Sequence, residues 1–278
     1  MSTCQEVLRQ AVESLVAAGV PEAEVDAWYL FEHVTGMSRA SYFLKMKEML
    51  SEEQKSKLEA LVRQRCKRIP LQYITGTQEF MGYSFLVSPS TLIPRQDTEI
   101  LVEEVSRVAN QKSVLDLCTG TGCILLSLAK LCRLTKAVGT DISAEAVETA
   151  KKNAKRLDAA AEFYCGDLFQ AVPSGERFDI LVSNPPYIPS AVIDTLMPEV
   201  REHEPMSALD GDADGLKFYR AIIKEANKYL NRPGKLFFEI GCEQGAEVSA
   251  LLLEHGFETV SIVKDLAGLD RVVSATLV

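Results

Sequence analysis

Four consecutive residues, Asn184-Pro185-Pro186-Tyr187, have the types and order expected of a site that handles a nitrogen atom. The two prolines remove two backbone donors and stiffen the chain, while their carbonyl oxygens remain acceptors. The Asn184 side-chain oxygen and the Pro185 carbonyl can together accept both hydrogens of an NH2 group, and the Tyr187 ring can stack on a planar amide or base. A rigid loop would explain the prolines but not the residues that flank them. We therefore predict that Asn184, Pro185 and Tyr187 are catalytic and that Pro186 joins them in binding the substrate.

A glycine turn lies upstream, where the apolar segment 114–117 runs into residues that open a helix. Glycine permits sharp turns and lets a ligand approach the backbone closely. A dinucleotide site needs the spacing Gly-x-Gly-x-x-Gly, but counting from Gly120 the third glycine would fall on Leu125. The turn therefore predicts a nucleoside ligand that carries an amino acid instead of a pyrophosphate. The predicted cofactor-binding residues of this turn are Cys118, Thr119, Gly120, Thr121 and Gly122.

Two acidic residues further along the chain extend this predicted cofactor site. Asp141 ends the next predicted strand, where a carboxylate can accept hydrogen bonds from two ribose hydroxyls. By itself it would be an ordinary strand-end residue, but its place behind a glycine turn favours ribose binding. Asp167 offers an acceptor for an exocyclic amine, and Leu168 with Phe169 offers apolar cover for a base. Asn184 completes the predicted contacts with the cofactor.

Metal sites and disulfides are not predicted. Residues 210–215 imitate the start of a calcium loop, but its twelfth position is Ala221, where a bidentate Glu is required. The seven cysteines are scattered and form no Cys-x-x-Cys pair, which fits neither a zinc site nor a disulfide framework. None of the three histidines lies in a motif, so we assign no general base.

The apolar pattern around these motifs predicts alternating strands and helices. Helices between the first five strands imply right-handed crossovers and a parallel sheet covered on both faces. The last two strands leave no room for a helix between them and predict an antiparallel hairpin at one edge. The fold class is therefore α/β, a doubly wound, mostly parallel seven-stranded sheet. The predicted strands are 113–117, 137–141, 162–165, 178–183, 235–240, 259–263 and 272–277, and a further helix is predicted at 97–109.

This topology also predicts where the motifs meet. In an open sheet of this kind, ligands bind beyond the carboxyl ends of the strands at the point where the strand order reverses. If the strand order follows other folds of this class, the first and fourth strands are neighbours there. The glycine turn and Asn184 are then expected to face each other across one crevice.

The N-terminal part predicts a small helical bundle over residues 1–70. Its apolar residues recur at helical spacing, Pro21 suits a first turn and Gly36 suits a helix end. Ser51 with Gln54 forms a capping box that opens the last helix. The basic run at the end of that helix fits either a docking patch for an acidic partner or cations favoured by the helix dipole. The run consists of Arg63, Arg65, Lys67 and Arg68.

A change of pattern marks the predicted domain boundary. Short alternating segments at 72–75 and 83–87 predict a β-hairpin linker over 71–90. Residues 91–278 then form the predicted cofactor-binding domain, while the helical bundle docks the substrate.

Composition bounds the partners and the location. A chain of 278 residues with 47% hydrophobic and 25% charged residues can bury a substantial core. The formal net charge of −9 argues against a protein that holds duplex nucleic acid through its phosphates. No apolar run approaches the roughly 20 residues of a membrane helix. We therefore expect a cytoplasmic monomer without membrane contact and without stable nucleic-acid binding.

Taken together, these motifs resemble the protein-(glutamine-N5) methyltransferase family, also called HemK-like, that modifies peptide chain release factors. The resemblance covers nearly the whole chain. The Asn-Pro-Pro-Tyr element is shared with adenine-N6 methyltransferases, so the flanking blocks are what select the glutamine family. Those blocks are Gln72-Tyr73-Ile74-Thr75-Gly76, Leu92-Ile93-Pro94-Arg95-Gln96-Asp97-Thr98-Glu99, Glu204-Pro205 with Ala208-Leu209, Asp214-Gly215-Leu216, and Asp265-Leu266-Ala267-Gly268.

The resemblance implies a class I, Rossmann-like methyltransferase that uses S-adenosyl-L-methionine and releases S-adenosyl-L-homocysteine. The implied reaction transfers the sulfonium methyl in line to the glutamine nitrogen of the Gly-Gly-Gln motif in class 1 release factors. The N-terminal helices would then serve as the docking platform for the rest of the release factor. An amide nitrogen is a poor nucleophile because its lone pair is delocalised, so positioning by Asn184 and Pro185 is the expected catalytic device.

Three positions depart from the family pattern, with Cys118 in place of Gly, Gln96 in place of Pro and Leu269 in place of Arg. A side chain at position 118 is expected to crowd the methionine end of the cofactor and to weaken its binding without abolishing it. Because Gly120 and Gly122 are present, the turn itself is expected to form.

Two other functions fit part of the sequence. An adenine-N6 nucleic-acid methyltransferase would use the same Asn-Pro-Pro-Tyr element, but the acidic balance and the lack of an evident target-recognition domain argue against it. A cofactor-binding module without activity, acting on translation by contact, is the other alternative. The intact element from Asn184 to Tyr187 argues against that interpretation.

Overall fold

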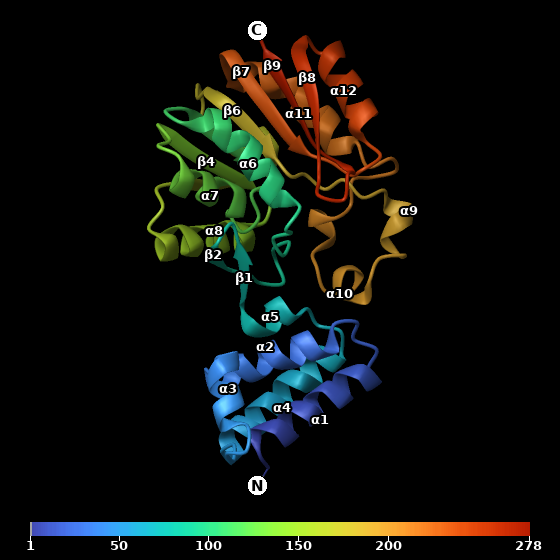
Figure 1. Ribbon diagram of the computed structural model, residues 1–278. Coiled ribbons are helices and arrows are strands. Elements are labelled where there is room, and N and C mark those ends of the chain that lie inside the picture. Colours follow the sequence, from blue (N-terminus) through green and yellow to red (C-terminus); the bar gives the residue numbers. More distant parts are fainter. Residues whose placement is uncertain (1) are drawn as a thin grey trace. The chain divides into compact units, whose positions relative to one another are not determined.

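The computed structural model describes residues 2–278, and its contacts divide them into two compact units (Figure 1). The smaller unit comprises the chain up to Gly76 together with Met197–His203. The larger unit comprises Thr77–Leu196 and Glu204–Val278. The smaller unit therefore includes a short segment from the second half of the chain, which the sequence pattern did not indicate.

The smaller unit is built from helices, and we call it the helical unit. Ser51 and Gln54 form the expected capping box, and Gly36 ends a helix in the left-handed conformation at φ 67°. Leu15, Leu30 and Phe31 are fully buried in its core. The helices are α1 (Cys4–Ala17), α2 (Ala23–Thr35), α3 (Arg39–Lys45), α4 (Glu52–Cys66), α5 (Leu71–Thr75) and α10 (Pro198–Arg201).

The expected strand at 72–75 is wrong, because these residues belong to α5. A helical turn follows Pro70, and the Gly76 N–H donates to the Gln72 carbonyl over 2.7 Å. Four or five alternating residues are too few for periodicity to separate a strand from one helical turn. The hairpin begins directly after Gly76 and consists of β1 (Thr77–Phe80) and β2 (Tyr83–Leu86). Both strands lie in the larger unit.

The larger unit contains the predicted seven-stranded sheet, in the order β5-β4-β3-β6-β7-β9-β8. Neighbouring strands from β5 to β7 are parallel, and β9 is antiparallel to both β7 and β8. The doubly wound α/β fold with an antiparallel edge is thus confirmed, and β3 lies beside β6 as expected. The strands are β3 (Ser113–Leu117), β4 (Lys136–Asp141), β5 (Glu162–Cys165), β6 (Phe178–Ser183), β7 (Leu230–Glu239), β8 (Phe257–Lys264) and β9 (Asp270–Leu277).

Helices cover both faces of this sheet (Figure 1). One core cluster contains Leu101, Leu125 and Val147, and the other contains Tyr219 and Val248. None of the described helices is long and apolar enough to cross a membrane. The helical elements are α6 (Thr98–Ala109), α7 (Cys123–Leu131), α8 (Ala144–Leu157), α9 (Ser190–Ile193), α11 (Lys217–Tyr229), α12 (Gly245–Glu254), and the 3-10 turns η1 (Leu168–Ala171) and η2 (Met206–Ala208).

Candidate active site

A pocket of about 310 Å³ opens at the carboxyl ends of β3, β4 and β6. All residues that line it belong to the larger unit. The pocket brings most of the predicted site residues together, and the glycine turn shares it with Asn184. The predicted residues that line it are Cys118, Thr119, Gly120, Thr121, Asp141, Asp167, Leu168, Asn184 and Pro186.

Asp141 holds the glycine turn in place. Its Oδ2 accepts a hydrogen bond from the Gly120 N–H at 2.8 Å, and its Oδ1 accepts one from the Ser143 N–H at 2.9 Å. Each carboxylate oxygen can accept a further hydrogen bond from a ligand. Gly120 has φ +55°, and a Cβ added there would meet no atom within 4 Å. The backbone of the turn is therefore open to close approach by a ligand at this point.

Gly122 is closely packed, and its predicted contact with the cofactor stays a prediction. It does not line the pocket, and its φ of +78° suits glycine. An added Cβ would lie 3.1 Å from Leu126 and 3.2 Å from both Ala150 and Phe163. Glycine is needed here because the start of α7 packs closely against α8 and β5.

Asp116 supports the same turn from inside the core. It is fully buried at the end of β3, and the Thr119 hydroxyl donates to its Oδ2 over 2.5 Å. Burial raises the pKa of Asp116 to about 7, although that hydrogen bond favours the ionised form. Asp116 does not line the pocket, so we assign it to the support of Thr119.

Cys118 lines the pocket in the left-handed conformation, with φ 60°. A residue with a Cβ is strained in this conformation, which explains why glycine suits the position better. Burial raises the pKa of the Cys118 thiol, so the group stays protonated at neutral pH. Cys118 therefore adds a small uncharged side chain to the pocket wall.

Asn184 follows β6 directly and lies beside α6. Its Nδ2 donates to the Thr98 hydroxyl oxygen over 3.4 Å. The preceding residue, Ser183, donates from its hydroxyl to the Leu117 carbonyl over 2.7 Å and so ties the ends of β6 and β3 together. These contacts place the Asn184 side chain in the pocket wall.

Pro185 and Tyr187 do not line the pocket, in contrast to Asn184 and Pro186. The Tyr187 hydroxyl donates to Glu239 Oε1 over 3.3 Å, and the Tyr187 carbonyl accepts from Gln244 Nε2 over 3.0 Å. The tyrosine hydroxyl is thus bound to a buried carboxylate, and stacking of the Tyr187 ring on the substrate stays a prediction. The Pro185 carbonyl remains a predicted acceptor.

Phe169, which was expected to cover a base, lies in the hydrophobic core of the larger unit. It is 6% exposed and stacks on Tyr229, with ring centroids 4.4 Å apart and an interplanar angle of 12°. Leu168, its neighbour, lines the pocket instead.

A buried carboxylate lies behind this part of the site. Glu239 is 1% exposed, and its Oε2 has no hydrogen-bond partner among the described residues. Burial raises its pKa to about 7, although hydrogen bonds from Thr98 and Tyr187 and the charge of Arg271 favour the ionised form. Thr98 thus contacts both Glu239 and Asn184, which connects the buried carboxylate to the pocket wall.

We expect Glu239→Gln to change the pH dependence of stability. Because the folded protein raises the pKa of Glu239 from 4.5 to about 7, folding favours the protonated carboxyl. This stabilising contribution is fully present below pH 4.5 and is lost as the pH rises through about 7. Glutamine is neutral throughout, so the variant should gain stability relative to the unaltered protein by on the order of 3 kcal/mol across this range. Thermal unfolding of both proteins at several pH values measures the change, and a Tm difference independent of pH contradicts it.

Several pocket residues were missed as individual site residues, although some lie in the blocks that carry the family resemblance. Arg95 lines the pocket and donates from Nη2 to the buried Glu204 at 2.7 and 2.8 Å. The sequence signal that could have identified Arg95 as a site residue is its charge directly after the apolar residues 92–94. The missed lining residues are Ser90, Thr91, Leu92, Pro94, Arg95, Thr98, Cys123, Ile124, Thr140, Ile142, Ser143, Met206, Ser207, Ala208, Asp210, Lys217 and Phe218.

The donor set of the pocket fits a nucleoside that carries an amino acid. Asp141 offers acceptors for ribose hydroxyls, Gly120 leaves open space beside its backbone, and Leu168 and Ile142 supply apolar walls. No cluster of potential metal ligands occurs among residues 2–278. The doubly wound sheet with this pocket at its strand ends agrees with the class I methyltransferase fold that the family resemblance implies.

Comparisons with known proteins identify the family. Residues 6–76 match the family model described as PrmC N-terminal domain, and residues 95–198 match the one described as Methyltransferase small domain. The chain is 42% identical over 276 residues to the release factor glutamine methyltransferase of Geobacter sulfurreducens, covering 99% of this chain and 97% of that protein. It is 43% identical over 283 residues to the protein of the same name from Agrobacterium fabrum, covering 98% and 97%. The chain belongs to the release factor glutamine methyltransferase family.

A solved structure supports the fold alone. A 16S rRNA methyltransferase of T. thermophilus, in complex with AdoMet and guanosine, has a TM-score of 0.54 at 20% identity. The match covers 72% of this chain and 49% of that one.

Proposed function

We propose that this protein methylates the side-chain nitrogen of a glutamine in a class 1 peptide chain release factor, with S-adenosyl-L-methionine as the cofactor. The glutamine is that of the Gly-Gly-Gln motif, as the family resemblance implies. The observation that carries this assignment is the joint pocket in which the glycine turn and Asp141 lie with Asn184. Cofactor chemistry and recognition of an NH2 group are thereby combined in one cavity.

The chain contributes binding and positioning. S-adenosyl-L-methionine supplies an activated methyl group on a sulfonium centre. Asp141 and Gly120 would hold its ribose and approach its amino-acid part, while Asp167 and Leu168 would contact the base. Asn184 and the Pro185 carbonyl would accept the two NH2 hydrogens and orient the nitrogen lone pair. Such preorganised contacts lower the barrier. The nitrogen would lose one of its two hydrogens as a proton to solvent when it takes the methyl group, since none of the residues that line the pocket is a histidine.

The helical unit is proposed to dock the rest of the release factor. None of its described residues is among those that line the pocket, which agrees with a role in docking. It also exposes large apolar side chains, with Phe43 69% exposed and Leu44 87% exposed. Exposed hydrophobic groups of this kind are typical of protein-binding surfaces.

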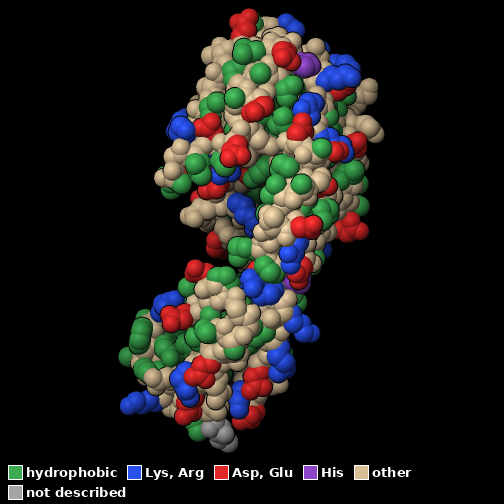
Figure 2. All heavy atoms as spheres, turned by 90° about the vertical axis from the view of Figure 1, so that its right-hand side faces the viewer, with side chains coloured by type: hydrophobic (Ala, Val, Ile, Leu, Met, Phe, Trp, Pro, Cys, Tyr) green, Lys and Arg blue, Asp and Glu red, His purple; other side chains and the backbone are tan. Residues whose placement is uncertain are grey.

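Nucleic acid is not proposed as the substrate. Figure 2 shows acidic and basic side chains interspersed over the face it presents, without a continuous basic stripe. Binding of nucleic acid through phosphates requires clustered Lys and Arg. We propose that the protein acts as a cytoplasmic monomer on a protein substrate.

Methylation of a purified class 1 release factor tests the proposal. After incubation with S-adenosyl-L-methionine, mass spectrometry should find one added methyl group on one glutamine of the Gly-Gly-Gln motif. A release factor with that glutamine replaced by asparagine is the matched control and should stay unmodified. Methylated adenine in nucleic acid incubated in the same way would indicate the alternative enzyme. Transfer to neither substrate would indicate a binding module without activity.

A further inference from the structure

The loop that follows the Asn-Pro-Pro-Tyr element returns to the pocket. Its two ends are joined, because the Ile188 N–H donates to the Leu209 carbonyl at 3.0 Å and the Gly211 N–H donates to the Ile188 carbonyl at 2.8 Å. Residues 206–208, on the returning limb, line the pocket. Displacement of this loop would therefore move part of the pocket wall.

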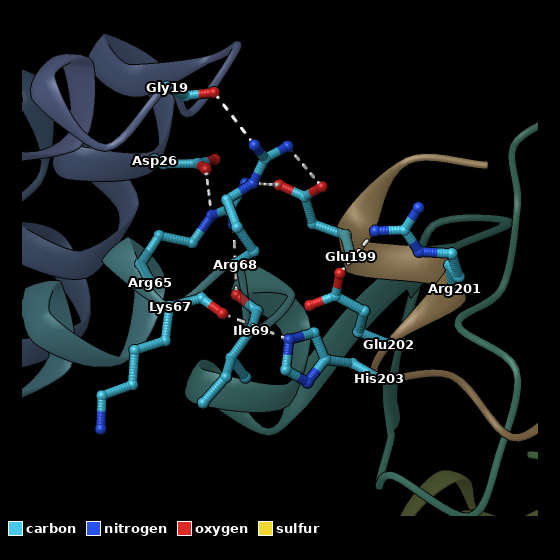
Figure 3. Close-up of polar contacts among 10 residues, drawn as sticks. All are labelled: Gly19, Asp26, Arg65, Lys67, Arg68, Ile69, Glu199, Arg201, Glu202 and His203. Atoms are coloured by element: carbon cyan, nitrogen blue, oxygen red, sulfur yellow. Dashed lines mark hydrogen bonds and ion pairs between the residues drawn. The ribbon is translucent and has the colours of Figure 1, made fainter. Parts of the chain in front are cut away.

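The tip of the same loop, residues 197–203, belongs to the helical unit. Glu199 in α10 is only 8% exposed there. Its Oε1 accepts from Arg65 Nη2 at 2.8 Å and from Arg68 Nε at 2.7 Å, and its Oε2 accepts from Arg68 Nη2 at 2.6 Å (Figure 3). Two guanidinium groups therefore hold one buried carboxylate. Arg65 and Arg68 of the basic run therefore bind a carboxylate of their own chain.

The charges of this cluster balance. Arg65 also donates from Nε to Asp26 Oδ2 at 2.6 Å, so two arginines face two carboxylates (Figure 3). Burial favours the protonated form of Glu199, yet the hydrogen bonds from Arg68 and Arg65 lower its pKa to about 2. Glu199 is thus ionised at neutral pH. Removal of its charge would leave Arg68 without its carboxylate.

The returning limb is also held at its start. The His203 Nε2 lies 3.3 Å from the Lys67 carbonyl, within the helical unit. The next residue, Glu204, is buried and accepts both hydrogen bonds from Arg95, which lines the pocket. The loop therefore contains two buried carboxylates that bind arginine, Glu199 and Glu204, before it reaches the pocket at residues 206–208.

We propose that Glu199 is a positioning residue, which holds the loop tip on Arg65 and Arg68 and thereby restrains the loop whose returning limb carries the pocket residues 206–208. The inference rests on the proposed function. It gives the helical unit a second role besides docking, because its arginines restrain a loop that reaches the pocket through the chain. Misplacement of a substrate-contacting wall by about 1 Å can lower a reaction rate by about a hundredfold.

Steady-state kinetics of three full-length variants test the proposal. Glu199→Gln removes the anchoring charge and keeps the shape of the side chain. Asp26→Asn is the matched control, because it removes the other carboxylate of the same buried cluster but lies in α2, outside the loop. Arg68→Lys keeps the charge but loses the two-point contact with Glu199. It tests the same anchor if Glu199→Gln does not fold. The release factor is the substrate, and calorimetry measures the affinity for S-adenosyl-L-homocysteine.

Glu199→Gln should lower kcat/KM for the release factor by about 10-fold to 100-fold, and Arg68→Lys by about threefold to tenfold. Affinity for S-adenosyl-L-homocysteine should stay within about twofold, since Asp141 and Gly120 are held by their own hydrogen bonds in the larger unit and not by the loop. Asp26→Asn should lower the Tm but leave kcat/KM within about threefold at temperatures where it is folded. An equal loss of kcat/KM in Asp26→Asn and Glu199→Gln would show a general effect of the helical unit and overturn the inference, as would unchanged kinetics of Glu199→Gln. If the unaltered protein does not methylate the release factor, the proposed function fails instead.

Discussion

Asn184→Ala is expected to lower the turnover of release factor methylation by about a hundredfold to a thousandfold. Asn184 lines the pocket, and its amide is expected to act on the acceptor nitrogen as the methyl group leaves sulfur. An interaction that strengthens toward the transition state changes kcat more than ground-state binding. Affinity for the cofactor should therefore fall much less than turnover. Single-turnover rates with saturating cofactor, together with calorimetry, separate the two effects.

Asn184→Asp sharpens this test because it keeps the shape of the side chain and replaces the NH2 donor with a second acceptor. The Asn184 Nδ2 donates to Thr98, so the Asp variant also loses this contact. It should be nearly as inactive as Asn184→Ala if that donor is needed to orient the side chain. Thr98→Val removes this contact together with the hydrogen bond to Glu239, and Glu239→Gln is the control for the second effect. A near-normal single-turnover rate of Asn184→Ala would leave the residue a structural cap of the loop and refute the proposed contact with the amide.

Asp141→Ala is expected to weaken cofactor binding by roughly 1.5 to 3 kcal/mol, which is about a 10-fold to 150-fold loss of affinity. The structure gives two reasons for a value near the upper end. Asp141 is the predicted acceptor for the ribose hydroxyls, and it also holds the Gly120 N–H at 2.8 Å. Its loss removes a ligand contact and releases the turn that the ligand approaches. Calorimetry with S-adenosyl-L-homocysteine measures the change.

Glu148→Ala provides the matched control for Asp141→Ala. Glu148 is an exposed acidic residue of α8 whose ion pair with Lys151 lies on the surface. Its removal should leave cofactor affinity within about twofold, because exposed pairs contribute little. Unchanged affinity in Asp141→Ala, with its fold intact by circular dichroism, would remove Asp141 from the cofactor site.

The amino-acid sequence was sufficient to predict the sheet and its antiparallel edge. Buried parallel strands such as 113–117 and 178–183 are short apolar runs bounded by turn residues, and these patterns are local. The segment 72–75 shows the limit, since so few residues do not distinguish a strand from the helical turn of α5. Among the strands, β7 differs most from its predicted bounds, because it starts at Leu230 instead of residue 235. Pairing of Phe178 with Leu230 extends that strand beyond its apolar part.

By itself the sequence determined the chemical character of the site. The Asn-Pro-Pro-Tyr element and the glycine turn are contiguous motifs, and sheet topology requires both to lie at the carboxyl ends of neighbouring strands. For this reason Asn184, Gly120 and Asp141 can be predicted as site residues from the sequence alone, and all three line one pocket.

Only the tertiary structure decided which way Tyr187 points and what the arginines at the end of α4 bind. Tyr187 turns to Glu239, 52 positions away, and Arg65 meets Glu199 at a separation of 134 positions. Contacts of this kind depend on buried charges finding partners wherever the fold brings them, and they leave no periodic signal along the chain. The assignment of residues 197–203 to the helical unit could not be predicted for the same reason.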